Sequence, residues 1–321
     1  MKPVAIFKRV LIAGLPLLLL AACEESVLTE QVPAAPPSAP PPMERPVPIV
    51  AAAPTSQKSA ELRRYFAQVQ SAQLTQGLLR QDGGGPDTPF SAEMLARNFE
   101  RLVFFNEYDR AFQGHGGPSP LRRWQGPVRM KIYFGAAVVP SQRARDTQDV
   151  ESYAARLGAL SGHPIGLSSR PNYAVIFAGD DDRGAVLSQV AREIPGLSDG
   201  SLRALRDLTR DTYCVVAAFA LGPDPNVYTA AVALIRGENP DLLRLSCIHE
   251  ELAQGLGIAN DSPEARPSIF NDDDEFALLT RHDELLLKML YDPRLQPGNT
   301  AEEARPTVLA IANELAGQPS F

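Results

Sequence analysis

Residues 250–261 read EELAQGLGIAND and form the most informative stretch of the chain. They end an amphipathic pattern that starts near Pro240 and predicts a helix to about Gly257, with leucine and isoleucine side chains facing the core. Residues 250 and 254 lie one turn apart on the same face of such a helix. A glycine at position 257 can adopt a positive φ, so the chain can turn and bring residue 260 toward the same point. The stretch therefore predicts a helix, a sharp turn and a cluster of polar side chains.

The spacing of this stretch resembles the metzincin zinc-peptidase motif, H-E-x-x-H-x-x-G-x-x-H followed by Asp. The general-base glutamate of that motif falls on Glu251, its glycine on Gly257 and its trailing aspartate on Asp261. The three zinc-binding histidines are replaced, and their positions hold Glu250, Gln254 and Asn260. The resemblance implies a zincin-like fold whose zinc-ligand positions no longer carry imidazoles.

The residues at these positions predict a site without zinc. The carboxamides of Gln254 and Asn260 are neutral oxygen donors and poor substitutes for imidazole nitrogen. His249 does not supply the missing nitrogen, because it lies about 100° around the helix from position 250. Since Glu250 and Glu251 are adjacent, we do not expect both side chains to face one ligand. The sequence therefore implies no metal and no cofactor, with Glu251 as a vestigial general base.

A second match follows the motif in the right order. Metzincins continue with a methionine turn and a helix that opens Leu-Thr-x-x-Asp and ends near Leu-Tyr. Residues 268–270 read SIF, so phenylalanine stands where the methionine would be, and residues 279–283 read LTRHD before Leu290 and Tyr291. Thr280 and Asp283 also predict a capping box at the start of that helix, with aspartate in place of glutamate.

The closer similarity is to an uncharacterised bacterial lipoprotein family, domain of unknown function 2927. The similar segments are residues 87–90, 250–254, 260–261, 268–272 and 290–295. They lie within about residues 60–300 and are specific as a set. The family has no established activity, so this similarity implies kinship without a function.

The pattern outside the motif predicts an α+β domain, residues 58–321, with one mixed sheet packed on helices. Helices are predicted over residues 59–79, from Ser91, over residues 149–160 and after residues 180–182. Strands are predicted over residues 128–134 and 173–177. The segments 213–221 and 228–235 are also rich in β-forming residues and are expected to be an antiparallel hairpin or two neighbouring strands. The last helix is expected to begin near Thr280. The acidic runs 180–182 and 271–275 are expected to be a helix start and a solvated loop, not metal sites.

Residues 1–22 have the pattern of a lipoprotein signal peptide. Three basic residues precede an apolar run of eleven residues, and Leu-Ala-Ala-Cys ends at Cys23. This ending resembles the lipobox of bacterial lipoproteins, which implies cleavage before Cys23 and lipidation of its thiol. An ordinary secreted protein with a chance cysteine at the cleavage point is the alternative.

Residues 23–57 predict a tether, because nine prolines between residues 31 and 55 favour extended polyproline II. Loss of the signal takes the formal net charge from −7 to about −10. Such an acidic body excludes nucleic acid as a partner and leaves membrane attachment to the lipid anchor. We expect the periplasmic face of a bacterial membrane, with inner or outer membrane left open.

Only Cys214 and Cys247 remain once Cys23 is assigned to lipid. In an oxidising compartment they have a single possible pairing, which would close a loop of about 34 residues. Two buried thiols are the alternative.

Two functions remain open. The first is a non-catalytic binding or scaffolding protein that takes an envelope peptide or protein in its cleft, because sheet edges pair with extended chains. The second is a metal-dependent, peptidase-like hydrolase in which Glu251 acts as general base, with Glu250 and Asp261 holding a harder cation or polarising water.

Overall fold

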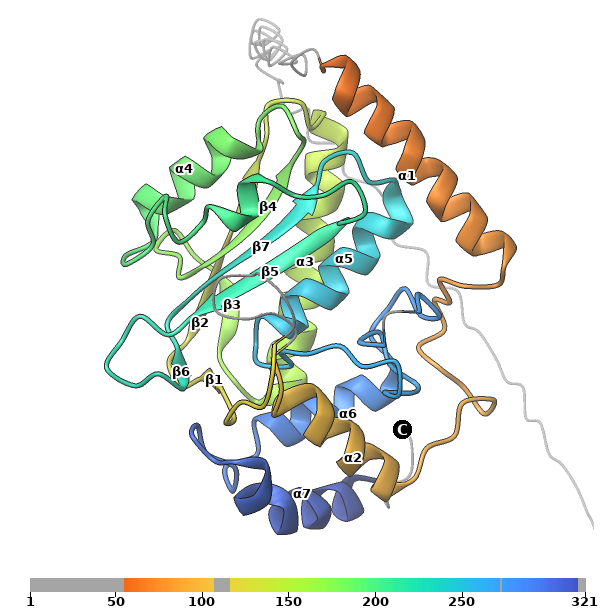
Figure 1. The fold of residues 1–321 in the computed structure, drawn as a ribbon, viewed down its shortest axis with the longest axis vertical. Helices are drawn as coiled ribbons and strands as arrows, with labels where there is room; N and C mark the ends of the chain where they lie inside the picture. Colours follow the sequence, from red (N-terminus) through yellow and green to blue (C-terminus); the bar gives the residue numbers. More distant parts are fainter. Residues whose placement is uncertain (1–54, 107–115, 272, 317–321) are drawn as a thin grey trace, which may run out of the picture. The chain divides into compact units, whose positions relative to one another are not determined.

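A computed structural model describes residues 55–106, 116–271 and 273–316 of the chain (Figure 1). The expected signal peptide, Cys23 and all but the last three residues of the expected tether lie outside these ranges. Within them, helices and strands combine as an α+β fold, as the sequence predicted. None of the helices in the described part of the chain has the length and apolar character that a membrane crossing requires.

A five-stranded mixed sheet forms the centre of the fold. Its strand order is β3-β2-β4-β7-β5, from Ile165–Leu167 through Val128–Phe134, Tyr173–Ala178 and Ala230–Arg236 to Cys214–Phe219. Four strands run parallel, and β5 at the edge pairs with β7 in the antiparallel sense. Of the two arrangements expected for residues 213–221 and 228–235, the antiparallel pairing is the one observed. Two short strands, β1 (Arg123–Trp124) and β6 (Val227–Tyr228), pair separately in parallel.

The two faces of the sheet contact different helices. Along β4, Tyr173, Val175 and Phe177 join the core on the face of α3 (Pro140–Ser161) and α5 (Asp241–Gln254). Ala174 and Ile176 point to the opposite face, where α4 (Arg183–Glu193) packs. All six side chains of β4 are buried, as period-two alternation between two covered faces requires. Figure 1 shows α4 and α3 on either side of the strands.

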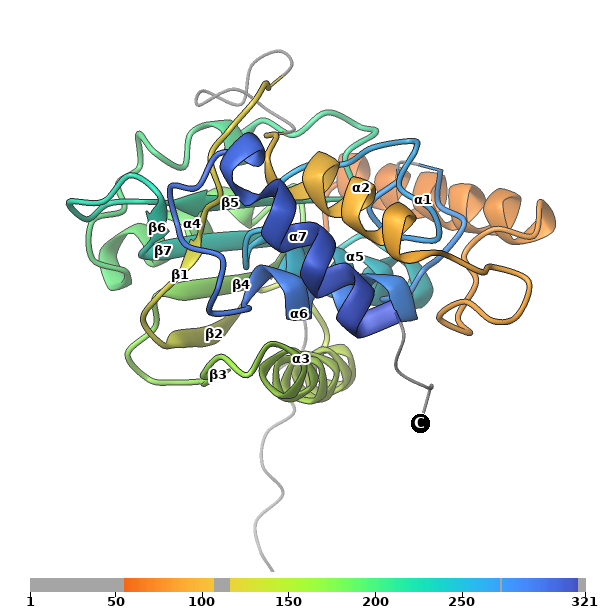
Figure 2. The same ribbon diagram turned by 90° about the horizontal axis from the view of Figure 1, so that it is seen from below.

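Three helices form a separate layer, in which α2 (Ala92–Val103) packs along α7 (Ala301–Ala316) and against α6 (Arg281–Leu290). Figure 2 shows α2 and α7 side by side. Ser91 caps α2 by accepting a hydrogen bond from the backbone of Met94. The capping box of Thr280 and Asp283 is present at the start of α6. Both caps confirm the sequence predictions.

Several element boundaries differ from those predicted. The expectation that the chain's last helix begins near Thr280 is wrong, since α7 follows it with Pro306 inside its second turn. Helix α3 begins at Pro140, nine residues before the predicted start. Helix α1 (Gln57–Thr75) ends four residues early, and α5 ends at Gln254 before a turn through Gly257. A short helix η1 (Ala204–Arg206) lies between α4 and β5.

Candidate functional site

The carboxyl end of α5 is held by side chains from other elements. The Tyr173 hydroxyl donates to the carbonyl of Glu251 at 2.8 Å, and Trp124 Nε1 donates to the carbonyl of Gly255 at 2.9 Å. The Tyr291 hydroxyl donates to the carbonyl of Leu256 at 3.1 Å. The Glu251 carbonyl also accepts from the backbone N–H of Gly255, whereas the carbonyls of Gly255 and Leu256, just after the helix, are satisfied by the two aromatic donors. The predicted turn therefore sits in a closely fitted environment.

Two glycines make this fit possible. Gly257 has φ +130°, which confirms the predicted turn, and a Cβ there would lie 2.4 Å from the carbonyl oxygen of Arg122. A Cβ on Gly255 would lie 2.1 Å from the hydroxyl oxygen of Tyr173. Any side chain at either position must displace buried neighbours.

Two of the three positions that resemble metzincin ligand positions hold hydrogen-bonded amides. Gln254 Nε2 donates to Asp261 Oδ1 at 2.8 Å, and Asn260 Nδ2 donates to the backbone carbonyl of Arg101 on α2 at 3.0 Å. The backbone N–H of Asn260 donates to the carbonyl of Leu102 at 3.1 Å. Carboxylate and carbonyl oxygens only accept hydrogen bonds, so both side-chain amides present their NH₂ groups to these partners.

The two adjacent glutamates lie beside a disulfide. Cys214 of β5 and Cys247 of α5 are bonded, with their Cα atoms 5.9 Å apart, so the predicted pairing is confirmed. A carboxylate oxygen of Glu250, one of Glu251 and the Sγ of Cys214 all lie within 4.8 Å of one another. One carboxylate oxygen of each adjacent glutamate therefore lies near the same disulfide sulfur. Glu251 is buried and Glu250 is half-buried.

His249 has a structural role. It is buried, its ring stacks on Tyr153 with centroids 4.1 Å apart, and its Nδ1 accepts a hydrogen bond from the backbone N–H of Leu279 at 3.0 Å. Burial, with a smaller effect from Arg156, lowers the pKa of His249 to about 3. The imidazole is therefore neutral, and its Nδ1 already accepts a hydrogen bond within the protein.

The segment matching the methionine turn is anchored to the start of α6. The buried carboxylate of Asp283 accepts hydrogen bonds from the Ser268 hydroxyl, the Ile269 backbone and both the backbone and hydroxyl of Thr280. Phe270, at the position of the turn methionine, is fully buried. One carboxylate thus fixes this turn and the helix cap together.

The acidic loop at residues 271–275 is ion-paired rather than freely solvated. Arg266 pairs with Asp273 and Glu275. Gln73 donates a hydrogen bond to Asp274. In the other acidic run, Asp182 accepts hydrogen bonds from the backbones of Gly179 and Ala137 just before α4 begins.

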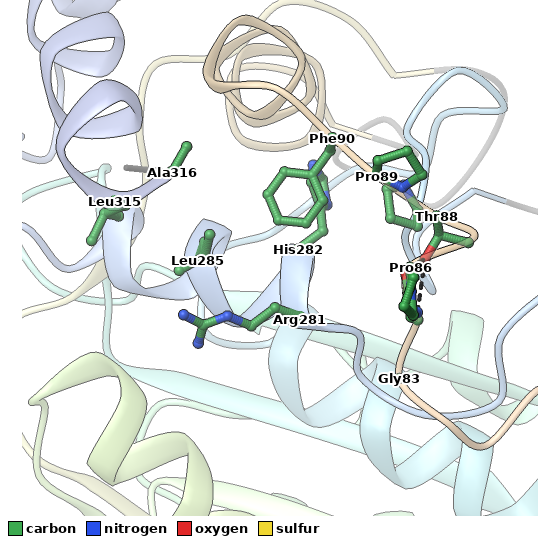
Figure 3. A pocket seen from close by; sticks show the side chains of 13 residues that line it. Gly83, Pro86, Thr88, Pro89, Phe90, Arg281, His282, Leu285, Leu315 and Ala316 are labelled. Atoms are coloured by element: carbon green, nitrogen blue, oxygen red, sulfur yellow. Dashed lines mark hydrogen bonds between the residues drawn. The ribbon is translucent and has the colours of Figure 1, made fainter. Parts of the chain in front are cut away.

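A cavity of about 470 Å³ lies between the loop before α2, the start of α6 and the end of α7 (Figure 3). Its walls are largely apolar, with Pro89 and Phe90 on one side and Leu285 and Leu315 on another. The Phe90 ring stands edge-on over His282, with centroids 5.0 Å apart. None of the predicted site residues lines this cavity. The glycine run at residues 83–85 also lines it, and no local sequence signal marks that role.

The sequence model of a family described as "Protein of unknown function (DUF2927)" matches residues 92–310, so the chain belongs to this family. No curated protein and no solved structure matches the chain.

Proposed function

We propose that this member of the DUF2927 family is a lipid-anchored protein of the bacterial cell envelope that binds or scaffolds an extended peptide or protein and does not catalyse. Its fold would be zincin-like with replaced ligand positions, and Cys23 would carry the lipid at the periplasmic face of the membrane. The anchor and tether rest on residues 1–57 of the sequence. The binding role rests on the geometry around α5 and β5.

The observation that carries the proposal is the state of the replaced ligand positions. The amides of Gln254 and Asn260 are committed as donors to Asp261 and to the Arg101 carbonyl. A set of one carboxylate and two amides does not fit zinc, which takes nitrogen and sulfur ligands or charged oxygens. His249 cannot join the set, since its Nδ1 already accepts from the Leu279 backbone. The metzincin-like scaffold would therefore hold no catalytic zinc.

The edge of the sheet supports a binding role. Strand β5 lies at the end of the sheet, and among the described residues its outer edge has no strand partner. Five of its six residues are half-buried, and the disulfide joins it to α5 beside Glu250 and Glu251. Exposed strand edges accept extended chains through main-chain hydrogen bonds. An extended peptide added to β5 would run past these two carboxylates.

Metal content tests the lost-site argument. Full-length protein purified in detergent without chelator is expected to hold no stoichiometric zinc. The variant Glu250→His/Gln254→His/Asn260→His is expected to bind one zinc ion, with affinity falling as pH drops through the histidine range. Arg64→His/Gln68→His, an exposed i,i+4 pair on α1, controls for two-ligand binding and should bind more weakly. Stoichiometric zinc in the wild type would overturn the lost-site argument, and no gain by the triple variant would overturn the metzincin geometry.

Cross-linking tests the binding role. A photo-activated cross-linking residue at Ala218 on β5 should capture an envelope peptide or protein in intact cells, and the same residue at Leu309 on α7 is the control. Leu309 is exposed on a helix remote in sequence from the motif. Equal capture at both positions, or none at Ala218, would contradict strand addition.

The second candidate function is a metal-dependent hydrolase. The cluster of Glu250, Glu251 and Cys214 favours it, because two carboxylate oxygens approach one point beside the edge strand. In the disulfide, however, the Cys214 sulfur is no thiolate ligand. The test is hydrolysis of a peptide mixture by the wild type. Loss of this activity in Glu251→Gln, with no change in Glu302→Gln, would favour this candidate.

A further inference from the structure

A pocket of about 750 Å³ opens at the amino ends of the parallel strands β4 and β7, on the face of the sheet where α4 packs. Asn172 and Thr229, which directly precede these two strands, line it, and the end of α4 with the residues after it forms a further wall. Its volume is in the range of ligand pockets. We call it the amino-end pocket.

Two exposed arginines stand side by side on one wall of the amino-end pocket. Arg129 Nε donates to the backbone carbonyl of Arg170 at 2.8 Å. The side-chain oxygen of Asn172 accepts from the Arg129 backbone at 2.7 Å, and the Asn172 backbone donates to the Arg129 carbonyl at 2.9 Å. These bonds fix the loop before β4 to β2. Both arginine side chains reach solvent, and within the described residues neither guanidinium has an ion-pair partner.

The carboxylate on the lining of this pocket is already compensated. One oxygen of Glu193 accepts from the Lys131 ammonium and from the Tyr133 hydroxyl, and the other accepts from Gln189. The hydrogen bond from Lys131, followed by that from Gln189, lowers the pKa of Glu193 to about 2. Glu193 is therefore ionised and paired with Lys131, which leaves the charges of both arginines unbalanced in a chain whose formal net charge is −7.

An apolar surface lies beside these cations. Ile194 is buried in the floor, and Leu221 is 44% exposed at the edge. A Cβ on Gly196 would lie 2.8 Å from Leu221 Cδ1, so one side of the leucine packs directly on the glycine backbone and the other side is open. The Leu221 backbone donates to the Thr229 hydroxyl at 2.9 Å, which fixes the leucine in place. The pocket therefore offers a held apolar side chain next to two cations that solvent can reach.

The amino-end pocket lies far from the start of the domain. The Ser56 backbone donates to Asp181 at 2.8 Å and the Ser59 hydroxyl donates to Glu238 at 2.7 Å, so α1 begins at the carboxyl ends of β4 and β7. These strands have six and seven residues. Their two ends are therefore about 20 Å apart. With the proposed tether before α1, a step that rests on the proposed anchor, the pocket faces a partner in the compartment better than the membrane surface.

We infer that the amino-end pocket binds an acidic peptide segment, with carboxylates against Arg129 and Arg170 and an apolar side chain against Leu221. Arginine suits carboxylates because its planar fork matches their two oxygens. Burial of an apolar side chain beside the ion pairs supplies the affinity that exposed ion pairs alone do not. The inference goes beyond the proposed strand addition at β5 and does not need it.

Fluorescence polarisation with labelled peptides and full-length protein in detergent tests the inference. The peptide EELLEE should bind saturably at low ionic strength and more weakly as salt is added, although the chain as a whole is acidic. The peptide EEGGEE should bind at least about tenfold more weakly, because it lacks an apolar side chain to bury. The peptide KKLLKK controls for attraction to the acidic body, and its binding should not weaken in Arg170→Glu.

Variants locate the binding on the pocket. Arg170→Glu reverses one charge of the wall and should weaken EELLEE binding about three- to tenfold. Leu221→Glu should weaken it at least about tenfold, because it removes the apolar contact and adds a like charge. Arg64→Glu on α1 and Leu309→Glu on α7 make the same two changes away from the pocket and should leave binding unchanged.

Three results would overturn the inference. They are the absence of saturable EELLEE binding, equal binding of EEGGEE, and binding that Arg170→Glu leaves unchanged. If phosphatidylglycerol vesicles bind the wild type and not Arg170→Glu while EELLEE does not bind, the pocket serves a membrane surface and the peptide is excluded. If Leu221→Glu fails to fold, Arg170→Glu still decides, because the Arg170 side chain makes no hydrogen bond within the described residues. Cross-linking at Ala218 tests strand addition separately.

Discussion

The Cys214–Cys247 disulfide offers a prediction whose magnitude follows from the structure. The bond joins residues separated by 33 positions and so closes a loop of about 34 residues. In the chain-entropy treatment, opening such a loop costs about 3.8 kcal/mol at 25 °C. Replacing both cysteines by alanine also removes a buried sulfur at position 247, for about 1 kcal/mol more. Reduced wild type should therefore lose about 4 kcal/mol, and the double variant about 5 kcal/mol.

Denaturant unfolding can be followed at a reporter placed beside this bond. Trp124 is the only tryptophan of the chain, is buried and donates to the Gly255 carbonyl at the end of α5. Its fluorescence should report the fall in the free energy of unfolding on reduction. Thermal unfolding should shift by about 8–15 °C, since each kcal/mol moves the midpoint by 2–4 °C in a domain of this size. Reductant should leave the double variant unchanged, which controls for other effects of the reagent.

Two results would refute this reasoning. The first is alkylation of Cys214 and Cys247 in denatured protein without reductant, since paired cysteines do not react. The second is a loss on reduction below about 1 kcal/mol, which would mean that the bond does not constrain the unfolded chain as the loop length requires.

Three further predictions concern the region around α5 and α6. Gly257→Ala should destabilise by at least about 2 kcal/mol, because it combines a positive φ with a contact to the Arg122 carbonyl, whereas Gly126→Ala, with open space around it, should cost little in the same unfolding assay. Asp283→Asn should cost at least about 2 kcal/mol, because its NH₂ would face donors that now bond a carboxylate, and an equal stability would contradict the anchoring role. His249 stays neutral in the folded state down to about pH 3, while the unfolded state takes up a proton below about 6.5, so this group should reduce stability by about 1.4 kcal/mol per pH unit across that window as pH falls. In His249→Asn the free energy of unfolding should therefore fall less steeply between these pH values, and parallel pH profiles would argue against a buried neutral imidazole.

Elements with strong local signals could be predicted closely. Strand β2 occupies Val128–Phe134, as its alternating pattern indicated. Successive side chains of a strand point to opposite faces of the sheet, so alternating residue types are a local signal of a strand. Helix α2 begins after the Ser91 cap for the same local reason. The missed helix α7 carries Pro306, and an internal proline removes a backbone donor and normally ends a helix. Pro306 is the sixth residue of α7, beyond the first four residues whose N–H groups have no acceptor within the helix, so α7 forms without one of its i→i−4 hydrogen bonds.

The residues around α5 likewise include some features with a local sequence signal and others that depend on the tertiary fold. The turn at Gly257 was predictable because a positive φ has a local sequence signature. The approach of Cys214 to Glu250 and Glu251 was not, because it depends on where the edge strand lies beside α5. A cavity lined by Arg236 draws residues from α1, the end of β7, the segment after β4 and the loop before β5, which only the tertiary fold brings together. No spacing in the sequence marks such a cavity.

Contacts to backbone groups hold the end of α5 and the turn that follows it. The end of α5 is held by donors from Tyr173, Trp124 and Tyr291, and all of them bond to backbone carbonyls. The turn that follows is held by the φ of Gly257 and by the backbone N–H of Asn260 on the Leu102 carbonyl. None of these contacts uses the side chains at positions 250, 254 or 260. The backbone of the turn is therefore held without the side chains at those positions. The triple-histidine variant keeps these backbone contacts, while it loses the hydrogen bonds that Gln254 donates to Asp261 and that Asn260 donates to the Arg101 carbonyl.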